Sequence, residues 1–423
     1  MGRSRTLILA LILIQGLWVF VLPGASAANR ISSWATPVNI SRTSSSVFTA
    51  IVERGLAVDP QGYIHAVFYG TQEIFYVNNT RGYWSIPYNV TQNDVLDQYP
   101  AIAIDAEGNI HLVYSGYDSN DMEIFYANKT ARGWSIPVNL SKNVNSDRVV
   151  SIAIDSKGFV HIAWYGRDGS STNDYEIFYT NNVQGYWISP LNVTSDTLAY
   201  AINPSIAIDP QDKIHIVWEG RDDSTFYDYE IFYANDVDES WVITNVTQNE
   251  IYDTSPSMDL DNSGNLHLAY QQYISVGEDL GAFNVLYVNR SVNGWAAPVN
   301  LSATRNLIGY LSLAADGEND VHIAFSQIEG SDFEVFYISR LGGIWGSPAN
   351  VTRNDLNEIG PNLVIDEFGD AHIIYYRDTE NDHNVFYVRS LRPSDLPILL
   401  IWIGVLVTGI ACGAAIWLLR KRD

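Results

Sequence analysis

The sequence predicts an all-β fold, a seven-bladed β-propeller of four-stranded blades. One pattern recurs seven times, with successive copies 46 to 55 residues apart, which is the range of propeller blades. Its segments alternate apolar and polar residues and are rich in β-branched and aromatic side chains, which favours strands throughout. The first strand of the chain precedes any complete copy and the last copy lacks that strand, an offset that a closed ring repairs.

The first two strands of each copy form a predicted hairpin marked by an Asp and a His six residues apart. Asp at the start of a D-x-x-G turn accepts backbone N–H groups, and Gly at its end tolerates positive φ. We expect the His to face a small residue across the hairpin in most copies, as His111 would face Ala103. The pairs are Asp59/His65, Asp105/His111, Asp155/His161, Asp209/His215, Asp261/His267, Asp316/His322 and Asp366/His372.

A metal-binding ring is the alternative interpretation of these seven histidines. Each His belongs to its own blade and lies inside a sheet, so we expect the seven rings to stay too far apart to share an ion. The repeat therefore predicts a structural role for them.

A third strand follows a polar loop, and a fourth strand begins at a Trp in each copy. These residues are Trp34, Trp84, Trp134, Trp187, Trp241, Trp295 and Trp345. Trp34 precedes every hairpin, and no Trp strand follows the final copy. We therefore predict that the strand at Trp34 pairs with residues 385–388 and completes the last blade.

The N-terminus has the features of a signal peptide over residues 1–27. Arg3 and Arg5 precede an apolar run over 6–22, and Ala25-Ser26-Ala27 fits a small-residue cleavage site. An uncleaved anchor helix is the alternative. The predicted ectodomain then covers residues 28–392.

The C-terminus predicts a transmembrane helix over 397–419, after a short linker at 393–396. These 23 uncharged residues would extend about 34 Å as a helix, which is enough to cross a bilayer core. Arg420, Lys421 and Arg422 follow, so we expect residues 420–423 in the cytoplasm and the propeller outside a single-pass cell-membrane protein. Gly409 and Gly413 form a GxxxG pair that would suit a homodimer.

Charge argues against two classes of partner. Between the two terminal segments 19 basic residues stand against 47 acidic ones, a formal charge of −28. Such a surface repels nucleic acid and anionic lipid, and it suits neutral ligands or divalent cations. The one cysteine, Cys412, lies in the predicted span, so no disulfide is expected outside.

N-x-S/T sequons recur in the fourth strand of every copy and follow the third strand in three of them. In an exported protein they are candidate glycosylation sites. The alternative is that the repeat itself requires Asn and Ser/Thr at a strand end, and both can hold. The sequons begin at Asn39, Asn89, Asn139, Asn192, Asn245, Asn300 and Asn350, and at Asn78, Asn128 and Asn289.

The run from the third strand to the Trp, such as YANKTARGWS, resembles a degenerate Asp-box of sialidase-like (BNR) repeat propellers. The D-x-x-G-N-x-H hairpin is similar to those proteins as well, and the likeness covers essentially the whole body. The box aspartate is missing here, because Arg81, Ala131 and Gln184 occupy the equivalent turns. The resemblance implies a propeller fold and says little about catalysis.

The loops between the second and third strands carry the candidate ligand-binding residues, since propeller sites lie on this face. The candidates are Arg167, Asp168, Arg221, Asp222, Arg377, Asp378, Tyr99 and Tyr252. The three Arg-Asp pairs are expected at equivalent repeat positions on separate blades. Acidic loop residues would suit Ca²⁺, although no calcium-loop spacing is present, and a solvated polar loop is the alternative; they are Asp174, Asp223 and Asp228.

Two functions remain open at this point. The first is a cell-surface ectodomain that binds glycan, protein or envelope components through its loop face. The alternative is a sialidase-like glycoside hydrolase or lyase that acts on extracellular carbohydrate. The enzyme needs loops from several blades to bring at least two arginines and an acid–tyrosine pair into one central pocket, and that pocket must hold residues that the repeat does not duplicate. No catalytic constellation or resident cofactor is visible in the sequence itself.

Overall fold

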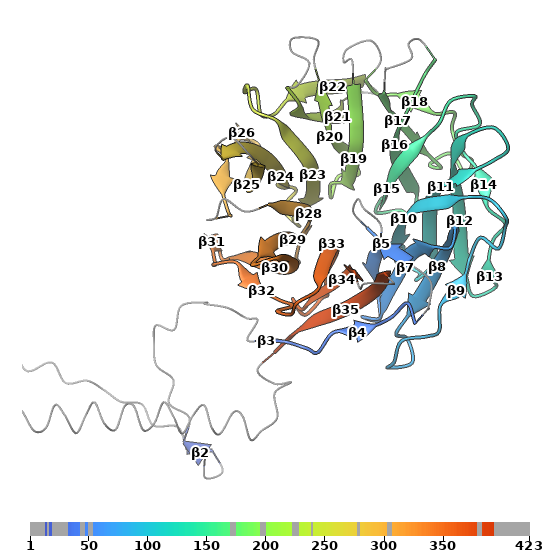
Figure 1. Cartoon of the computed structure of the whole chain (residues 1–423). Helices are drawn as coiled ribbons and strands as arrows, with labels where there is room; N and C mark the ends of the chain where they lie inside the picture. Colours follow the sequence, from blue (N-terminus) through green and yellow to red (C-terminus); the bar gives the residue numbers. More distant parts are fainter. Residues whose placement is uncertain are drawn as a thin grey trace, which may run out of the picture.

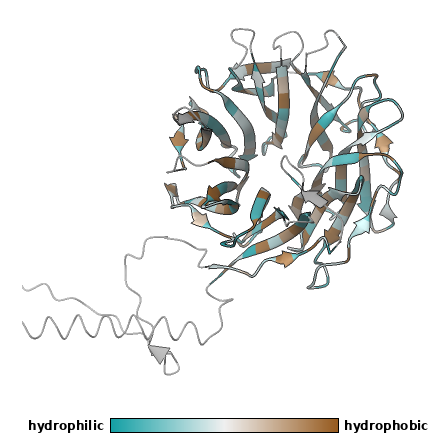
Figure 2. Ribbon diagram, viewed as in Figure 1, coloured by the Kyte–Doolittle hydropathy of each residue, from teal (hydrophilic) through white to brown (hydrophobic). Residues whose placement is uncertain are grey.

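The computed structural model describes residues 13–14, 17–18, 33–42, 47–49, 54–169, 175–194, 200–221, 228–237, 240–276, 280–302, 307–378 and 383–392. Seven antiparallel sheets surround a common centre, as Figure 1 shows, and no helix occurs in this part of the chain. The predicted seven-bladed propeller is confirmed. Figure 2 shows apolar and polar residues mixed along the strands. The second strands are buried on both faces, because each blade packs against a neighbour on either side.

Blade 2 has the order of strands that the repeat predicts. Its first strand, β10 (Asp97–Ile104), pairs with β11 (Ile110–Tyr117), which pairs with β12 (Met122–Thr130). The outer edge consists of β13 (Gly133–Trp134) and β14 (Val138–Asn139), both paired with β12. His111 lies opposite Ala103, which confirms the predicted register.

The other blades repeat this order. Blade 1 contains β5 (Val47–Thr49), β6 (Leu56–Val58), β7 (Ile64–Gly70), β8 (Glu73–Asn78) and β9 (Tyr88–Asn89). Blade 3 contains β15 (Arg148–Ile154), β16 (Val160–Gly166), β17 (Glu176–Asn181) and β18 (Leu191–Asn192). Blade 4 contains β19 (Tyr200–Ile208), β20 (Ile214–Arg221), β21 (Glu230–Val237) and β22 (Ser240–Asn245). Blade 5 contains β23 (Asp253–Leu260), β24 (Leu266–Val276), β25 (Leu280–Ser291), β26 (Gly294–Trp295) and β27 (Val299–Asn300). Blade 6 contains β28 (Ile308–Ala315), β29 (Val321–Glu329), β30 (Asp332–Leu341), β31 (Ile344–Trp345) and β32 (Ala349–Asn350).

Blade 7 is closed by the N-terminal strand. It contains β33 (Asn357–Ile365), β34 (Ala371–Asp378) and β35 (His383–Leu391), with β3 (Ser33–Trp34) and β4 (Val38–Asn39) at its outer edge. Trp34 is in register with Ser390 and Val38 with Tyr387, so the predicted closure is confirmed. Figure 1 shows blue β4 beside red β35, where the two ends of the propeller meet.

The fourth strand is interrupted in most blades, whereas the sequence predicts one continuous strand. A proline lies between the Trp and the Asn of this strand in every blade except blade 4. Proline has no N–H to donate to the ladder, so the pairing stops at that point. Blade 4 has Val242-Ile243-Thr244 there instead, and its β22 runs unbroken along β21.

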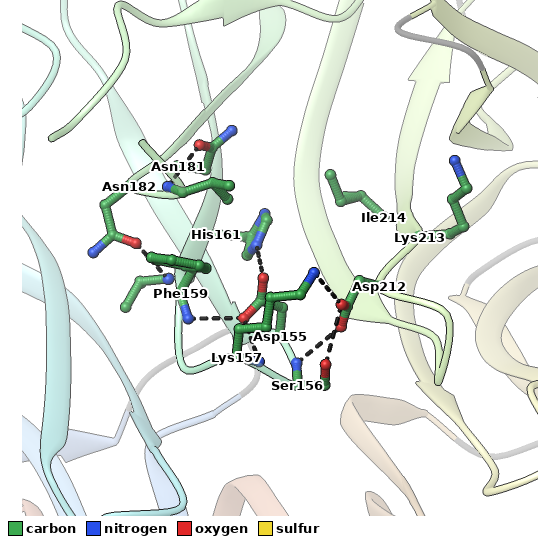
Figure 3. Close-up of polar contacts among 12 residues, drawn as sticks. Asp155, Ser156, Lys157, Phe159, His161, Asn181, Asn182, Asp212, Lys213 and Ile214 are labelled. Carbon is green, nitrogen blue, oxygen red and sulfur yellow. Dashed lines mark hydrogen bonds and ion pairs between the residues drawn. The ribbon is translucent and has the colours of Figure 1, made fainter. Parts of the chain in front are cut away.

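Each blade contains a buried Asp–His–Tyr triad, and the Tyr ring of the triad packs against the next blade. In blade 3 the His161 Nδ1 lies 2.7 Å from the Tyr179 hydroxyl. Figure 3 shows the contact on the other side of the ring, where Nε2 lies 3.5 Å from Asp155. Burial lowers the pKa of His161. The Tyr179 ring then meets the Trp241 ring of blade 4 edge-on, at 5.3 Å between centroids. All seven histidines bond within their own blades, as we expected.

The predicted terminal segments lie almost wholly outside the described residues. Within the predicted signal peptide the structure describes only the two-residue strands β1 (Leu13–Ile14) and β2 (Leu17–Trp18), which pair with each other. Residues 393–423, with Gly409, Cys412 and Gly413, are beyond the described part. Across the residues that the structure describes, no helix is long and apolar enough to cross a membrane.

Candidate functional site

The propeller has two faces, which the strand directions define. One end carries the turns between first and second strands and between third and fourth strands, such as 105–109 and 131–132, and we call it the hairpin face. The opposite end carries the loops between second and third strands and the connections to the next blade, such as 118–121 and 140–147. We call this end the loop face. All predicted ligand-binding residues belong to its loops or to their margins.

Seven aromatic rings form a continuous chain across the loop face of blades 3, 4 and 5. Each ring meets the next at 5.0 to 6.2 Å between centroids, with interplanar angles of 61° to 89°. Such edge-to-face contacts are favourable for aromatic quadrupoles. We call this chain the tyrosine array; in order it is Tyr165, Tyr175, Tyr200, Tyr229, Tyr252, Phe283 and Tyr273.

The array crosses two blade boundaries because its tyrosines stand at strand starts. Tyr175 and Tyr229 directly precede the third strands of blades 3 and 4, and Tyr200 begins β19. Tyr175 meets Tyr200 at 5.3 Å, and Tyr229 meets Tyr252 at 5.0 Å. The candidate residue Tyr252 thus lies in an assembled aromatic surface.

Three of the array tyrosines are hydrogen-bond donors at neutral pH. Burial raises the pKa of Tyr165 and of Tyr200 to about 12, and it also raises the pKa of Tyr252. Their hydroxyls therefore stay protonated, so these groups can donate a proton or a hydrogen bond but are poor bases.

Two predicted arginines, Arg167 and Arg221, lie against this array. The Arg167 Nη2 donates to the Tyr175 hydroxyl at 2.8 Å, and its guanidinium lies 4.6 Å from the centre of that ring. Arg221 lies between two rings, 5.6 Å from the centre of Tyr200 and 5.8 Å from that of Tyr229. Asp168 follows Arg167 on the same loop, while Asp222 lies outside the described residues.

Arg377 does not belong to this group, so the expectation of three equivalent Arg-Asp pairs is wrong. It comes five residues after His372, whereas Arg167 and Arg221 come six residues after their histidines. Successive side chains of a strand point to opposite faces, so this one-residue offset turns Arg377 the other way. Its Nε donates to the buried Glu358 at 2.6 Å. Asp378 pairs with His383 Nδ1 at 3.1 Å.

Tyr99 belongs to a second tyrosine group, on the loop-face side of blades 1, 2, 6 and 7. It lies on a bulge of β10 with φ of 52°, and its ring is 6.2 Å from that of Tyr69. Burial, and then the neighbours Tyr99, Tyr376 and Tyr310, raise the pKa of Tyr69 to about 12. Blades 1, 2, 6 and 7 thus each contribute one tyrosine.

Glu219 is an acid that the other blades lack. It follows His215 by four residues, where the other blades have Tyr69, Ser115, Tyr165, Gln271, Ser326 and Tyr376. It is 3% exposed, and it accepts hydrogen bonds from the Thr254 hydroxyl and, at 2.7 Å, from the backbone N–H of Ser255. Burial raises the pKa of Glu219, which favours its protonated form.

Glu219 also connects the two tyrosine groups. In its ionised form Glu219 contributes to raising the pKa of Tyr200 and Tyr252 in the array and of Tyr310 in the second group. The loop face therefore combines two arginines with an acid–tyrosine arrangement from several blades, including one acid that is not duplicated. These features meet part of the requirement for the enzyme alternative, which also needs them together in one central pocket.

One arginine side chain crosses the centre of the propeller. Arg54, in a left-handed conformation with φ of 82°, donates from Nη2 to the Ile206 carbonyl at 2.6 Å and so reaches from blade 1 to blade 4. A cavity of about 300 Å³ lies among the first strands and is lined largely by Ala, Val, Ile and Leu side chains. The polar chemistry described above is therefore on the loop face.

The predicted calcium ligands are not brought together in the described residues. Asp174 and Asp223 lie outside them, and Asp228 directly precedes Tyr229. A different trio, Asp118, Asp121 and Glu123, has carboxylate oxygens within 4.8 Å of one another. Both Glu123 oxygens already accept hydrogen bonds, from Ser141 and from the backbone N–H of Asn143, so internal contacts account for this residue.

The fourth-strand sequons have a structural reason in every blade. The hydroxyl of each Ser or Thr accepts the backbone N–H of a residue near the start of the third strand. The same hydroxyl donates to a Glu or Asn at that start; Thr194, for example, bonds Glu176. The repeat thus requires these hydroxyls, and glycosylation stays a prediction.

Several site residues escaped prediction, namely Tyr165, Tyr200, Tyr229, Tyr273, Phe283 and Glu219. A local signal exists for Tyr229 and for its counterpart Tyr175, because the sequence Asp-Tyr-Glu occurs at the start of the third strand in blades 3 and 4 alone. A signal also exists for Glu219, since it is the one acid at its repeat position.

No protein-family model matches the sequence, and no curated protein does either. Solved structures share the fold. A PL25 ulvan lyase bound to a repeat of glucuronic acid and sulfated rhamnose has a TM-score of 0.57 at 12% identity, covering 83% of this chain and 97% of that one. The polysaccharide lyase Uly1 has a TM-score of 0.55 at 13% identity, covering 85% and 99%. A Penicillium chrysogenum α-L-arabinanase complexed with arabinobiose has a TM-score of 0.52 at 13% identity, covering 72% and 96%.

Proposed function

We propose that this protein acts on an extracellular carbohydrate that binds along the tyrosine array of blades 3, 4 and 5. The single observation that carries the proposal is the unbroken chain of aromatic rings, flanked by Arg167 and Arg221. Sugar rings present C–H faces that pack on aromatic side chains, while their hydroxyls need donors and acceptors at the edge. The array supplies both along one direction, which suits a chain of sugar units.

A cleaving activity, by hydrolysis or elimination, is favoured over binding alone. Burial keeps the hydroxyls of Tyr165, Tyr200 and Tyr252 protonated, and a protonated hydroxyl can hand a proton to the oxygen of a departing sugar. The arginines can hold an anionic substituent or stabilise charge that develops next to it. Glu219 ties the bulge at Ser255 to blade 4 and so fixes the geometry between Tyr200 and Tyr252. The similarly folded lyases and arabinanase act on polysaccharides, which agrees with this choice.

The experiment incubates the purified full chain with neutral, uronate-containing and sulfated polysaccharides. New reducing ends together with ultraviolet absorbance of an unsaturated uronate would identify a lyase, and reducing ends alone a hydrolase. Affinity electrophoresis of the same samples measures binding separately from cleavage. We expect Tyr229→Ala to weaken binding about tenfold, in line with the loss of one stacking contact.

Tyr83→Ala is the matched control, because Tyr83 is 61% exposed on the hairpin face, at the opposite end of the propeller from the array. It should leave both measurements unchanged. Absence of both binding and product for every polysaccharide class would refute the proposal. If the protein is retarded by a polysaccharide in affinity electrophoresis but releases no product, it binds carbohydrate and the proposed cleaving activity is refuted.

A further inference from the structure

Both ends of the propeller body emerge on the hairpin face. Leu391 at the end of β35 pairs with Ser33 at the start of β3, and both lie at the end of blade 7 that carries its hairpin turn. Arg392 holds this exit in place. It donates from Nε and Nη2 to the two carboxylate oxygens of Asp370, at 2.7 and 2.6 Å, and Asp370 belongs to that turn.

The exit is held on a second side by an aromatic ring. The Arg392 guanidinium lies 4.7 Å from the centre of the Phe368 ring. A bidentate ion pair with a ring contact fixes an arginine far better than a single exposed bridge would. The position at which the chain leaves the propeller is therefore fixed to the hairpin face.

Only residues 393–396 separate this fixed exit from the apolar run at 397–419. Four residues span at most about 14 Å when fully extended. We propose that the hairpin face rests on the membrane surface and that the loop face, with the tyrosine array, points away from the bilayer. The proposal uses the predicted span but does not depend on the proposed carbohydrate chemistry.

The hairpin face also has side chains that suit a lipid headgroup region. Next to the exit, Phe368 of blade 7 is 61% exposed and Ile344 of blade 6 is 76% exposed. On the other side, blade 1 presents Tyr63 and Tyr83, which are exposed as well. Tyrosine and tryptophan are enriched at membrane–water interfaces, because one end of each ring is apolar and the other polar. The four residues flank the exit on blade 7 and on both neighbouring blades.

The arrangement has a consequence for access. A span attached near the loop face would bring the tyrosine array against the lipid headgroups. Attachment at the hairpin face instead leaves the array open to polymers in the surrounding medium. The two ends of the chain thus set which of the two faces meets a large soluble ligand.

The test places one fluorophore on each face of the full chain in lipid vesicles. In a Cys412→Ser background, Ile344→Cys labels the hairpin face and Val144→Cys labels the loop face; these side chains are 76% and 85% exposed. Phosphatidylcholine vesicles carry a nitroxide on the lipid headgroup as the quencher. We expect the Ile344→Cys probe to be quenched severalfold more strongly than the Val144→Cys probe.

A second variant carries a Gly/Ser linker of about 20 residues after residue 392, which adds a mean reach of roughly 25 Å. The insertion should reduce quenching at Ile344→Cys toward the Val144→Cys value. Equal quenching of the two probes before insertion, stronger quenching on the loop face, or failure of the chain to co-float with the vesicles would each overturn the proposal. Carbohydrate binding assayed on the same vesicles reports on the proposed function separately.

Discussion

The Trp34 ring packs edge-on against the Tyr337 ring of blade 6, with centroids 5.1 Å apart and an interplanar angle of 72°. Tyr76 and Trp134 make the same contact between blades 1 and 2, at 5.4 Å and 80°. The N-terminal strand therefore makes the full interblade contact that internal outer strands make. Closure of the ring depends on side-chain packing as well as on the short ladders of β3 and β4.

Replacing Trp34 should open the ring at this contact. We expect Trp34→Ala to lower the free energy of unfolding by about 2–3 kcal/mol, somewhat less than for a fully buried Trp because the side chain is half-buried. Urea denaturation followed by circular dichroism measures this. Trp34→Phe keeps an edge-on ring and should lose less than half as much, and equal losses for the two variants would argue against the ring contact as the cause.

Arg377 and Arg221 lie in different environments, so replacing the first should affect stability and replacing the second should affect ligand binding. Arg377→Met leaves the buried Glu358 without its cation, and we expect a loss of roughly 3–5 kcal/mol in the free energy of unfolding. Arg221→Met should change stability by less than about 1 kcal/mol and weaken carbohydrate binding instead. Burial raises the pKa of Glu358, so the loss in Arg377→Met should shrink at acidic pH as Glu358 takes up a proton. A pH-independent loss would show that packing, not charge, is responsible.

The sequon hydroxyls should matter in protein that carries no glycan. Thr194 is fully buried and bonds Glu176, which is 1% exposed. In a host without N-glycosylation we expect Thr194→Val to cost about 1–3 kcal/mol of folding free energy, because a buried carboxylate loses its donor. Thr194→Ser keeps the hydroxyl and should lose much less. Wild-type stability in Thr194→Val would mean that the hydroxyl serves only as part of a glycosylation signal.

Asp147 should make the free energy of unfolding depend on pH, in a direction that follows from its raised pKa. Burial, reinforced by the charge of Glu123, raises the pKa of Asp147 from 3.8 to about 7. Between these values the folded state holds a proton that the unfolded state has lost, so the contribution of Asp147 to stability falls as the pH rises from about 4 through 7. Asp147→Asn carries no charge and escapes this loss.

The free energy of unfolding of Asp147→Asn, relative to that of the wild type, should therefore increase between pH 4.5 and 8 by on the order of a few kcal/mol. Thermal or urea unfolding of both proteins across this range gives the difference directly. Histidines and carboxylates that do not interact with Asp147 titrate alike in both proteins and cancel, which leaves Asp147 and its neighbour Glu123. A difference that stays constant with pH would contradict the raised pKa of Asp147.

The fold was predictable because its information is local and repeated. An Asp and a His six residues apart fix a hairpin, and the displaced Trp34 fixes ring closure. The interrupted fourth strand was readable too, since each proline is in the sequence. The extent of pairing on either side of each proline was not, because it depends on how the outer strand lies against its neighbour.

The site was less predictable, because it depends on contacts between blades. Tyr229 is recognisable as a residue at a strand start, but its contact with Tyr252 depends on how two sheets twist and pack. Arg377 shows the opposite failure. Its sequence neighbours resemble those of Arg167, yet a shift of one residue places it on the other side of its strand, where Glu358 is its partner.

The prolines of the outer strands have a further consequence for self-association. Outer strands present a free edge, and an uninterrupted edge is a template for pairing with another molecule. Six blades interrupt that edge with Pro37, Pro87, Pro137, Pro190, Pro298 and Pro348. Blade 4 has no such protection, and β22 offers six consecutive residues along its outer side. Edge-to-edge aggregation of this propeller should therefore begin at blade 4, and a proline in place of Ile243 or Thr244 should suppress it.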